Sequence, residues 1–239
     1  MYRSSSLQTG HAPGGRRGAL ELMRALSRRE RRELHSAGRA ALEATQAFLQ
    51  QGKTVISEVI GQTPYVEWAH YPEHDAKTPT GALFYYHAHA ARQRIAGEHG
   101  HFHIFAANRR AGCPPDQRYT HIVGVSVDDR GMPIRLFTTN QWVTAECWED
   151  AARVCALARR ARLKTTPAHA VGEWLDAVLA FFRPQIDDIL YLRDARIREL
   201  TGRGRSHLLE DRRSHILSQC RIDFSTQILA LEELGGYTP

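Results

Sequence analysis

The chain has 239 residues, of which 42% are hydrophobic and 24% are charged, and its formal net charge at pH 7 is +6. This composition is typical of a globular protein with enough apolar residues to form a core without disulfides. The longest apolar runs, Ala177–Phe182 and Ile122–Val127, are far too short for a transmembrane helix, which excludes an integral membrane protein.

Location and partners are indicated by the termini, the charges and the cysteines. The first residues contain arginines but no apolar segment, so we expect no secretory signal and a cytoplasmic location. The arginines are spread over several predicted helices, which argues against a nucleic-acid partner. The four cysteines, Cys113, Cys147, Cys155 and Cys220, form no C-x-x-C pair, and we expect reduced thiols.

We expect a flexible tail at residues 1–18 and a single α+β domain at 19–239, because no long polar linker divides the chain. The tail is followed by a helical pattern from Leu20 to Leu26, which restarts at the capping box Ser27–Glu30. Thr54–Ile60 fits either a strand or a last helical turn. Residues 63–79 contain three prolines and predict a long ordered loop of the kind that covers a site.

From Gly81 the apolar period changes to two residues, which predicts strands. The four expected strands are Ala82–Ala90, Gly100–Ala106, His121–Val127 and Ile134–Thr139. Because the connections are short, we expect a four-stranded antiparallel sheet at 81–140, flanked by N-terminal and C-terminal helices.

The part from 144 to 235 predicts helices. One begins at Thr144 with Glu146 and Glu149 in its first turn and ends near Arg162, which suits the helix dipole. A second is capped by Thr166–Pro167 and kinked or split by Pro184, and a last one runs from Ser206 to Leu234.

The chemistry of the sequence is concentrated in the segment Tyr85–Phe105. Eight of the thirteen histidines lie between residues 70 and 121, and two His-x-His pairs face each other across the predicted hairpin. Because side chains alternate along a strand, each pair projects from one face of its strand. Neutral imidazoles gathered beside a carboxylate are what zinc, iron or copper binding requires.

The predicted metal ligands are His87, His89, His101 and His103. Four nitrogens suit a closed structural site, whereas three histidines with Glu98 leave positions open for water and substrate. Glu98 and His99 are the candidate catalytic residues, since a carboxylate or a spare imidazole beside the ligands can move protons. Glu98 can instead orient a ligand histidine. The roles of His121, Asn140 and Trp142, at the third strand and after the fourth, stay open.

Three motifs, Tyr85–His89 (YYHAH), Gly97–His103 (GEHGHFH) and Phe137–Thr144 (FTTNQWVT), resemble an uncharacterised bacterial family that is known as a domain of unknown function. The resemblance spans most of residues 65–200 and implies that the three motifs belong to one module. It implies no activity.

Two further resemblances are local. His99–Phe105 is similar to the strand of the histidine-triad nucleotide hydrolases and transferases, which implies His101 as a nucleophile toward phosphorus. Gly100 departs from the apolar residue usual in that family, and His87–His89 has no counterpart there. Tyr86–His89 is similar to the His-x-His of JAMM metalloproteases, but the serine and aspartate expected downstream are missing.

The sequence therefore predicts a transition-metal protein, most simply a metal-dependent hydrolase or oxygenase that acts on a small molecule. A metal-free nucleotide hydrolase that uses His101 and a non-catalytic metal-binding module are the alternatives.

Overall fold

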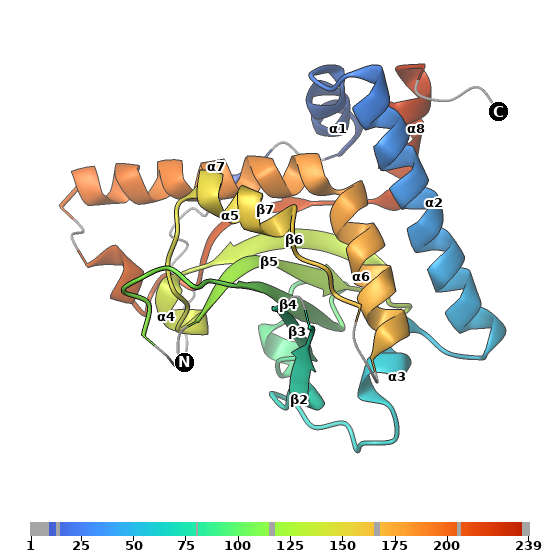
Figure 1. Cartoon of the computed structure of the whole chain (residues 1–239), viewed down its shortest axis with the longest axis horizontal. Coiled ribbons are helices and arrows are strands. Elements are labelled where there is room, and N and C mark those ends of the chain that lie inside the picture. The colour runs from blue at the N-terminus through green and yellow to red at the C-terminus, as the bar shows by residue number, and fades with distance from the viewer. Residues whose placement is uncertain are drawn as a thin grey trace.

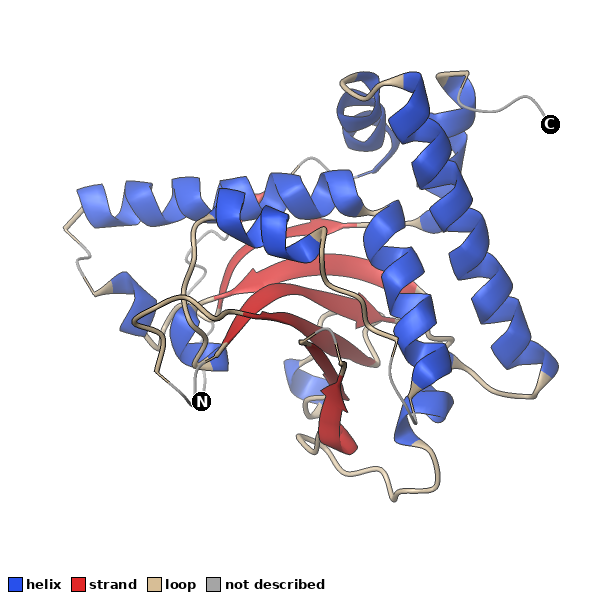
Figure 2. Ribbon diagram, viewed as in Figure 1, coloured by secondary structure: helices blue, strands red, loops and turns tan. Residues whose placement is uncertain are grey.

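The computed structural model describes residues 10–12, 15–79, 81–114, 118–164, 168–204 and 207–235. It is an α+β fold, as the sequence predicted, in which helices lie across one face of a single curved sheet (Figures 1 and 2). None of the helices in these ranges is long and apolar enough to cross a bilayer.

The sheet has seven strands in the order β1-β7-β6-β5-β4-β3-β2. Six of them pair antiparallel, and β1 pairs parallel with β7 at one edge. The strands are β1 (Gly10–His11), β2 (Tyr71–Lys77), β3 (Ala82–His87), β4 (Gly100–Ala107), β5 (Tyr119–Val127), β6 (Pro133–Thr139) and β7 (Ile216–Arg221).

The predicted number of four strands is wrong, although β3 to β6 are the four that were predicted. Strand β2 lies within the expected loop 63–79, where Pro72 is tolerated because β2 is an edge strand with an irregular register. Strand β7 interrupts the expected last helix. The short apolar run of β7 fits a helix as well as a strand in the sequence. It forms a strand because it pairs with β6, where Leu136 lies opposite Cys220.

The helices are α1 (Gly15–Arg24), α2 (Arg28–Gln50), α3 (Val55–Ile60), α4 (Gln141–Thr144), α5 (Ala151–Ala158), α6 (His169–Phe181), α7 (Arg183–Gly202) and α8 (Phe224–Glu233), with short 3-10 turns at Ala91–Gln93 and Leu208–Glu210. The capping box at the start of α2 is present: the Ser27 hydroxyl accepts the Glu30 N–H, and Glu30 accepts the Ser27 N–H. Thr54 caps α3, so this segment is helical. Helix α1 begins within the expected tail.

The helix expected from Thr144 to Arg162 is divided. Helix α4 ends at Thr144, and α5 begins after the cap Asp150, whose carboxylate accepts the Arg153 N–H. Between them the side chains of Glu146 and Glu149 are buried and hydrogen bonded inside the protein, whereas the helix dipole argument expected them in the first turn of a helix. Helices α6 and α7 split before Pro184, as expected. The expected caps at Thr166–Pro167 and Ser206 lie outside the described residues.

The two faces of the sheet have different chemistry. Phe102 on β4 faces the helices, where its ring lies 5.8 Å from that of Trp174 on α6. Tyr86 packs beside Phe102 on the same face, with ring centroids 5.0 Å apart. Because strand side chains alternate, the histidines of β3 and β4 point to the opposite face.

The cysteines differ from the prediction. Cys113 and Cys147 form a disulfide, and only Cys155 and Cys220 are free, both buried. The expectation of four reduced thiols was wrong for this pair, because C-x-x-C spacing reports only neighbours in sequence and these residues are 34 positions apart.

Candidate metal centre

Three histidines converge on the face of the sheet opposite the helices. In the register of β3 and β4, His87 lies opposite His101, and His103 lies opposite Tyr85. One ring nitrogen from each of His87, His101 and His103 lies within 4.8 Å of the other two, a spacing at which they could hold a metal ion. The Nε2 atoms of His87 and His101 are 2.8 Å apart. His101 and His103 are buried.

Glu98 fixes the orientation of His101. The Nδ1 of His101 lies 2.8 Å from Oε1 of Glu98, and since a carboxylate only accepts hydrogen bonds, Nδ1 carries the proton. The lone pair of the neutral ring is then on Nε2, which faces His87. Burial opposes ionisation of Glu98, but the hydrogen bond from His101 and the guanidinium of Arg135, 3.4 Å away, together lower its pKa to about 2.

His121 contacts the far ring nitrogen of His103, as Glu98 contacts that of His101. The Nδ1 of His103 lies 3.0 Å from Nε2 of His121, and the Nδ1 of His121 lies 3.2 Å from the Thr139 hydroxyl. A metal on Nε2 of His103 requires the proton on Nδ1, which then donates to His121. Such partners on the far ring nitrogen accompany most metal-binding histidines.

Burial keeps these imidazoles neutral. It lowers the pKa of His87 to about 2 and that of His121 to about 3, and the charge of Arg193 lowers the pKa of His121 further. The pKa of His103 is lowered well below its ordinary value for the same reason. The neutral imidazole is the form that binds metals, so at neutral pH protons do not compete for these nitrogens.

His89, the fourth predicted ligand, lies beside the three. Its ring centroid is 5.0 Å from those of His87 and His101, and its face stacks on the exposed ring of Trp68 at 4.1 Å. Burial, and then His101, lower its pKa to about 4. The loop that precedes β2 thus covers the edge of the cluster with Trp68.

His99 lies away from the cluster. Its Nδ1 is hydrogen bonded to the Tyr86 hydroxyl, and Tyr86 belongs to the helix-covered face. The regular alternation of β4 begins only at Gly100, so it does not extend to His99. Asn140 and Trp142 serve the junction between β6 and α4: Asn140 caps α4 and donates to Leu208 O, and both side chains donate to Ser214 O.

Phe137 and Gly124 form a part of the site that the sequence analysis missed. The Phe137 ring lies perpendicular to His101 and His103, with centroids 5.2 and 5.7 Å apart. It crosses the sheet over Gly124, where an added Cβ would lie 2.5 Å from its Cε1. The only hint in the sequence was a glycine inside an otherwise apolar strand.

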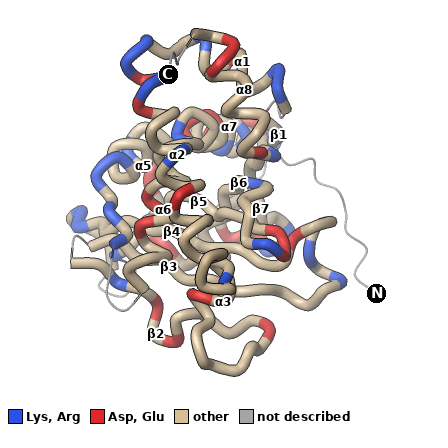
Figure 3. The backbone as a smooth tube through the Cα atoms, turned by 90° about the vertical axis from the view of Figure 1, so that its right-hand side faces the viewer, with Lys and Arg blue, Asp and Glu red and all other residues tan. Residues whose placement is uncertain are grey.

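The charged residues of the described part of the chain are spread over many elements. Figure 3 shows lysine and arginine positions scattered over several elements, with acidic positions among them.

Comparison with known proteins gives one result. A family model described as a domain of unknown function (DUF6969) matches residues 35–222. This confirms the resemblance to a family of unknown function and extends it on both sides of residues 65–200. No curated protein and no solved structure matches the chain.

Proposed function

The chain belongs to the DUF6969 family, a domain of unknown function, and from its histidine cluster we propose that it binds a divalent transition metal and acts with it as an enzyme. The observation that supports this most is the convergence of His87, His101 and His103 together with the partners on the far side of two rings. A merely structural cluster would not need hydrogen-bond partners on the far nitrogen of two of its rings.

The donor set favours zinc, iron or copper. Three neutral imidazoles suit these ions, whereas calcium and magnesium prefer oxygen. Three protein ligands leave coordination positions for water and substrate, as in catalytic sites. A bound ion would polarise a substrate or lower the pKa of a water molecule.

The residues of the chain then have distinct roles. His87, His101 and His103 bind the ion, Glu98 orients His101, and the neutral ring of His89, which lies beside the ligands under Trp68, accepts a proton. His99 was a catalytic candidate in the sequence, but its hydrogen bond to Tyr86 does not support that role. The reaction class we propose is hydrolysis or oxygenation of a small molecule.

Cobalt substitution tests this proposal. Co²⁺ bound by three imidazoles should give visible d–d bands, and azide should change them because a position is open. An unchanged spectrum with azide would instead indicate a closed four-histidine site that includes His89, which is the non-catalytic module. His169→Ala, on the exposed face of α6, should bind Co²⁺ like the wild type.

The Glu98–His101 pair also favours a second candidate. A carboxylate that holds Nδ1 of a histidine leaves Nε2 as a nucleophile, which is the arrangement that metal-free phosphoryl transfer at His101 needs. Hydrolysis of adenosine phosphoramidate in the presence of chelator, lost in His101→Ala, would support this candidate and contradict the metal-dependent one.

A further inference from the structure

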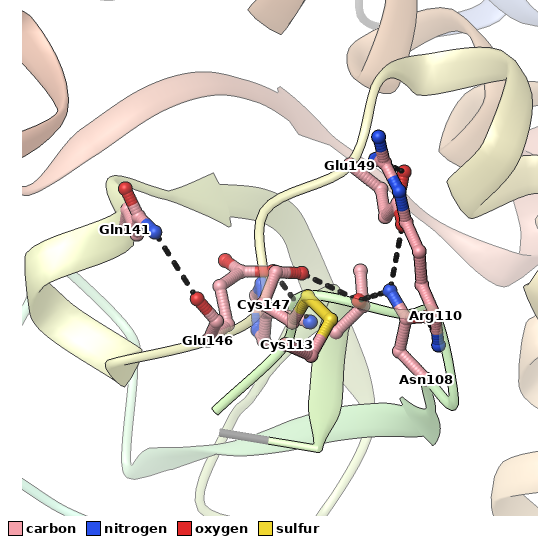
Figure 4. The surroundings of a disulfide bond; sticks show 9 residues. Asn108, Arg110, Cys113, Gln141, Glu146, Cys147 and Glu149 are labelled. Carbon is pink, nitrogen blue, oxygen red and sulfur yellow. Dashed lines mark hydrogen bonds and ion pairs between the residues drawn. A yellow bond between two sulfur atoms is a disulfide. The ribbon is translucent and has the colours of Figure 1, made fainter. Parts of the chain in front are cut away.

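The segment 145–149 between α4 and α5 lies against the start of β5 and is fixed there by a disulfide. Cys147 is bonded to Cys113, and Figure 4 shows this bond beside Glu146. The Cys147 N–H donates to Tyr119 O at 2.9 Å, and the Thr120 hydroxyl donates to Cys147 O at 2.6 Å. The segment thus follows β5 next to His121.

The far end of the segment is also held. The Glu149 carboxylate accepts from the Asn108 amide at 2.8 Å and pairs with Arg110 at 3.2 Å (Figure 4). Arg193 on α7 donates to the Glu149 carbonyl at 2.7 Å. With a covalent bond in the middle and ionic bonds at the end, the segment has a fixed position on β5.

Glu146 uses this position to hold the backbone of His121. Its side chain is 2% exposed, and its Oε2 accepts the His121 N–H at 2.7 Å. Its Oε1 accepts from the Thr144 hydroxyl at 3.2 Å. Among the described residues no arginine, lysine or histidine side chain is bonded to this carboxylate, so both oxygens serve to position the chain. Burial raises the pKa of Glu146 to about 7, although the His121 N–H and the charge of Arg193 oppose this shift. A buried carboxyl group is costly, which makes its presence informative.

The hydrogen bond between the His121 N–H and Glu146 lies where the pairing of β5 with β4 is irregular. Ile104 pairs with Val123 and Phe105 pairs with His121, so Ile122 is an extra residue in β5. An extra residue shifts the alternation by one. Gly124 and Ser126 face the histidine cluster, and without the bulge His121 would face the helices. The bulge therefore brings His121 to His103.

We infer that Glu146, supported by the Cys113–Cys147 disulfide, is a positioning residue of the metal centre: it holds the β5 bulge that directs His121 onto the ligand His103. The effect on metal affinity rests on the proposed function, whereas the effect on the His103–His121 bond does not. Glu146 acts through the backbone N–H of His121, so a neutral acceptor of the same shape can replace it.

The first experiment measures Co²⁺ affinity in four variants. Glu146→Ala should bind roughly 10- to 100-fold more weakly, the usual effect of losing the support behind a ligand histidine. Glu146→Gln should restore wild-type affinity, since its amide oxygen accepts the His121 N–H. Cys113→Ser should also weaken binding. Asp223→Ala removes the cap of α8 and controls for a general loss of stability, so its affinity should stay at the wild-type value.

The second experiment needs no metal. In the metal-free protein, two-bond ¹H–¹⁵N spectra of the histidine rings should show His103 and His121 each with the proton fixed on Nδ1. Glu146→Ala should give mixed tautomers at both rings, and Glu146→Gln should not. Unchanged ring spectra in Glu146→Ala would overturn the inference even if no metal binds. Equal losses of affinity in Glu146→Ala and Asp223→Ala would do the same.

Discussion

Replacing Gly124 with alanine tests whether the Phe137 ring supports the histidine cluster. An added Cβ would lie 2.5 Å from Cε1 of Phe137, whereas carbon atoms in contact are about 3.5–4.0 Å apart, so the ring has to shift by about 1 Å. It has little room, because His101 lies at one edge and the Arg135 guanidinium lies 4.7 Å above the ring centroid.

The magnitude follows from two opposing effects. Overpacking a buried site costs about 1–3 kcal/mol, whereas alanine in a strand is favoured over glycine by about 0.5–1 kcal/mol. We expect a net loss of about 1–2 kcal/mol in the free energy of unfolding. For a chain of this length that lowers the melting temperature by about 2–8 °C.

The assay is a double-mutant cycle in urea. Phe137→Leu shortens the side chain that the new methyl group meets, so Gly124→Ala should cost less in the Phe137→Leu background than in the wild type, with a coupling of about 0.5 kcal/mol or more. Metal affinity should fall in Gly124→Ala, because the displaced ring presses on His101 and His103. Additive effects, or a Gly124→Ala variant as stable as the wild type, would refute the reasoning.

Three further predictions concern stability. Glu98→Ala leaves the buried Arg135 without its carboxylate and should lose about 3 kcal/mol in urea denaturation, and an unchanged midpoint would contradict the role of this pair. In chelator, the free energy of unfolding should fall below pH 6.5, since the unfolded chain then protonates histidines that stay neutral in the fold. The loss between pH 7 and 5.5 is about 1 kcal/mol for each buried histidine, and His121→Leu should flatten this dependence. Asn140→Ala should cost about 1–3 kcal/mol, because it removes the cap of α4 and the buried hydrogen bonds from the Asn140 amide to Leu208 O and Ser214 O, while Co²⁺ affinity of the folded protein stays constant; weaker binding would place Asn140 in the site.

The core of the candidate site could be predicted because it depends on local regularity. His87, His101 and His103 lie in two adjacent strands joined by a short connection, so the period of two residues and the hairpin together bring them to one face. The same reasoning accounts for β3 to β6. Gly100, which departs from the histidine-triad pattern, has a reason in the fold, since a Cβ there would lie 2.7 Å from the His87 carbonyl oxygen.

What could not be predicted depends on breaks in that regularity or on distant contacts. The bulge at Ile122 reverses the face of His121, and a bulge leaves no mark in the apolar pattern. His99 precedes the regular part of β4, so the alternation of strand side chains does not apply to it. It is hydrogen bonded to Tyr86 and does not lie beside the predicted ligands. Glu146 resembled an acidic residue of a helix start, but its partner is the backbone of a strand 25 positions earlier.

The central claim is that His87, His101 and His103 bind one transition-metal ion, and it is tested most directly by metal content and melting temperature with and without chelator. The wild type should hold one ion per chain and, at free metal 100 times the dissociation constant, gain about 2.7 kcal/mol, which is about 5–10 °C. Alanine at any of the three histidines should abolish metal binding and the gain in melting temperature, and His169→Ala should change neither quantity. A wild type that binds no zinc, iron, copper, nickel or manganese and gains no thermal stability from them would contradict the claim.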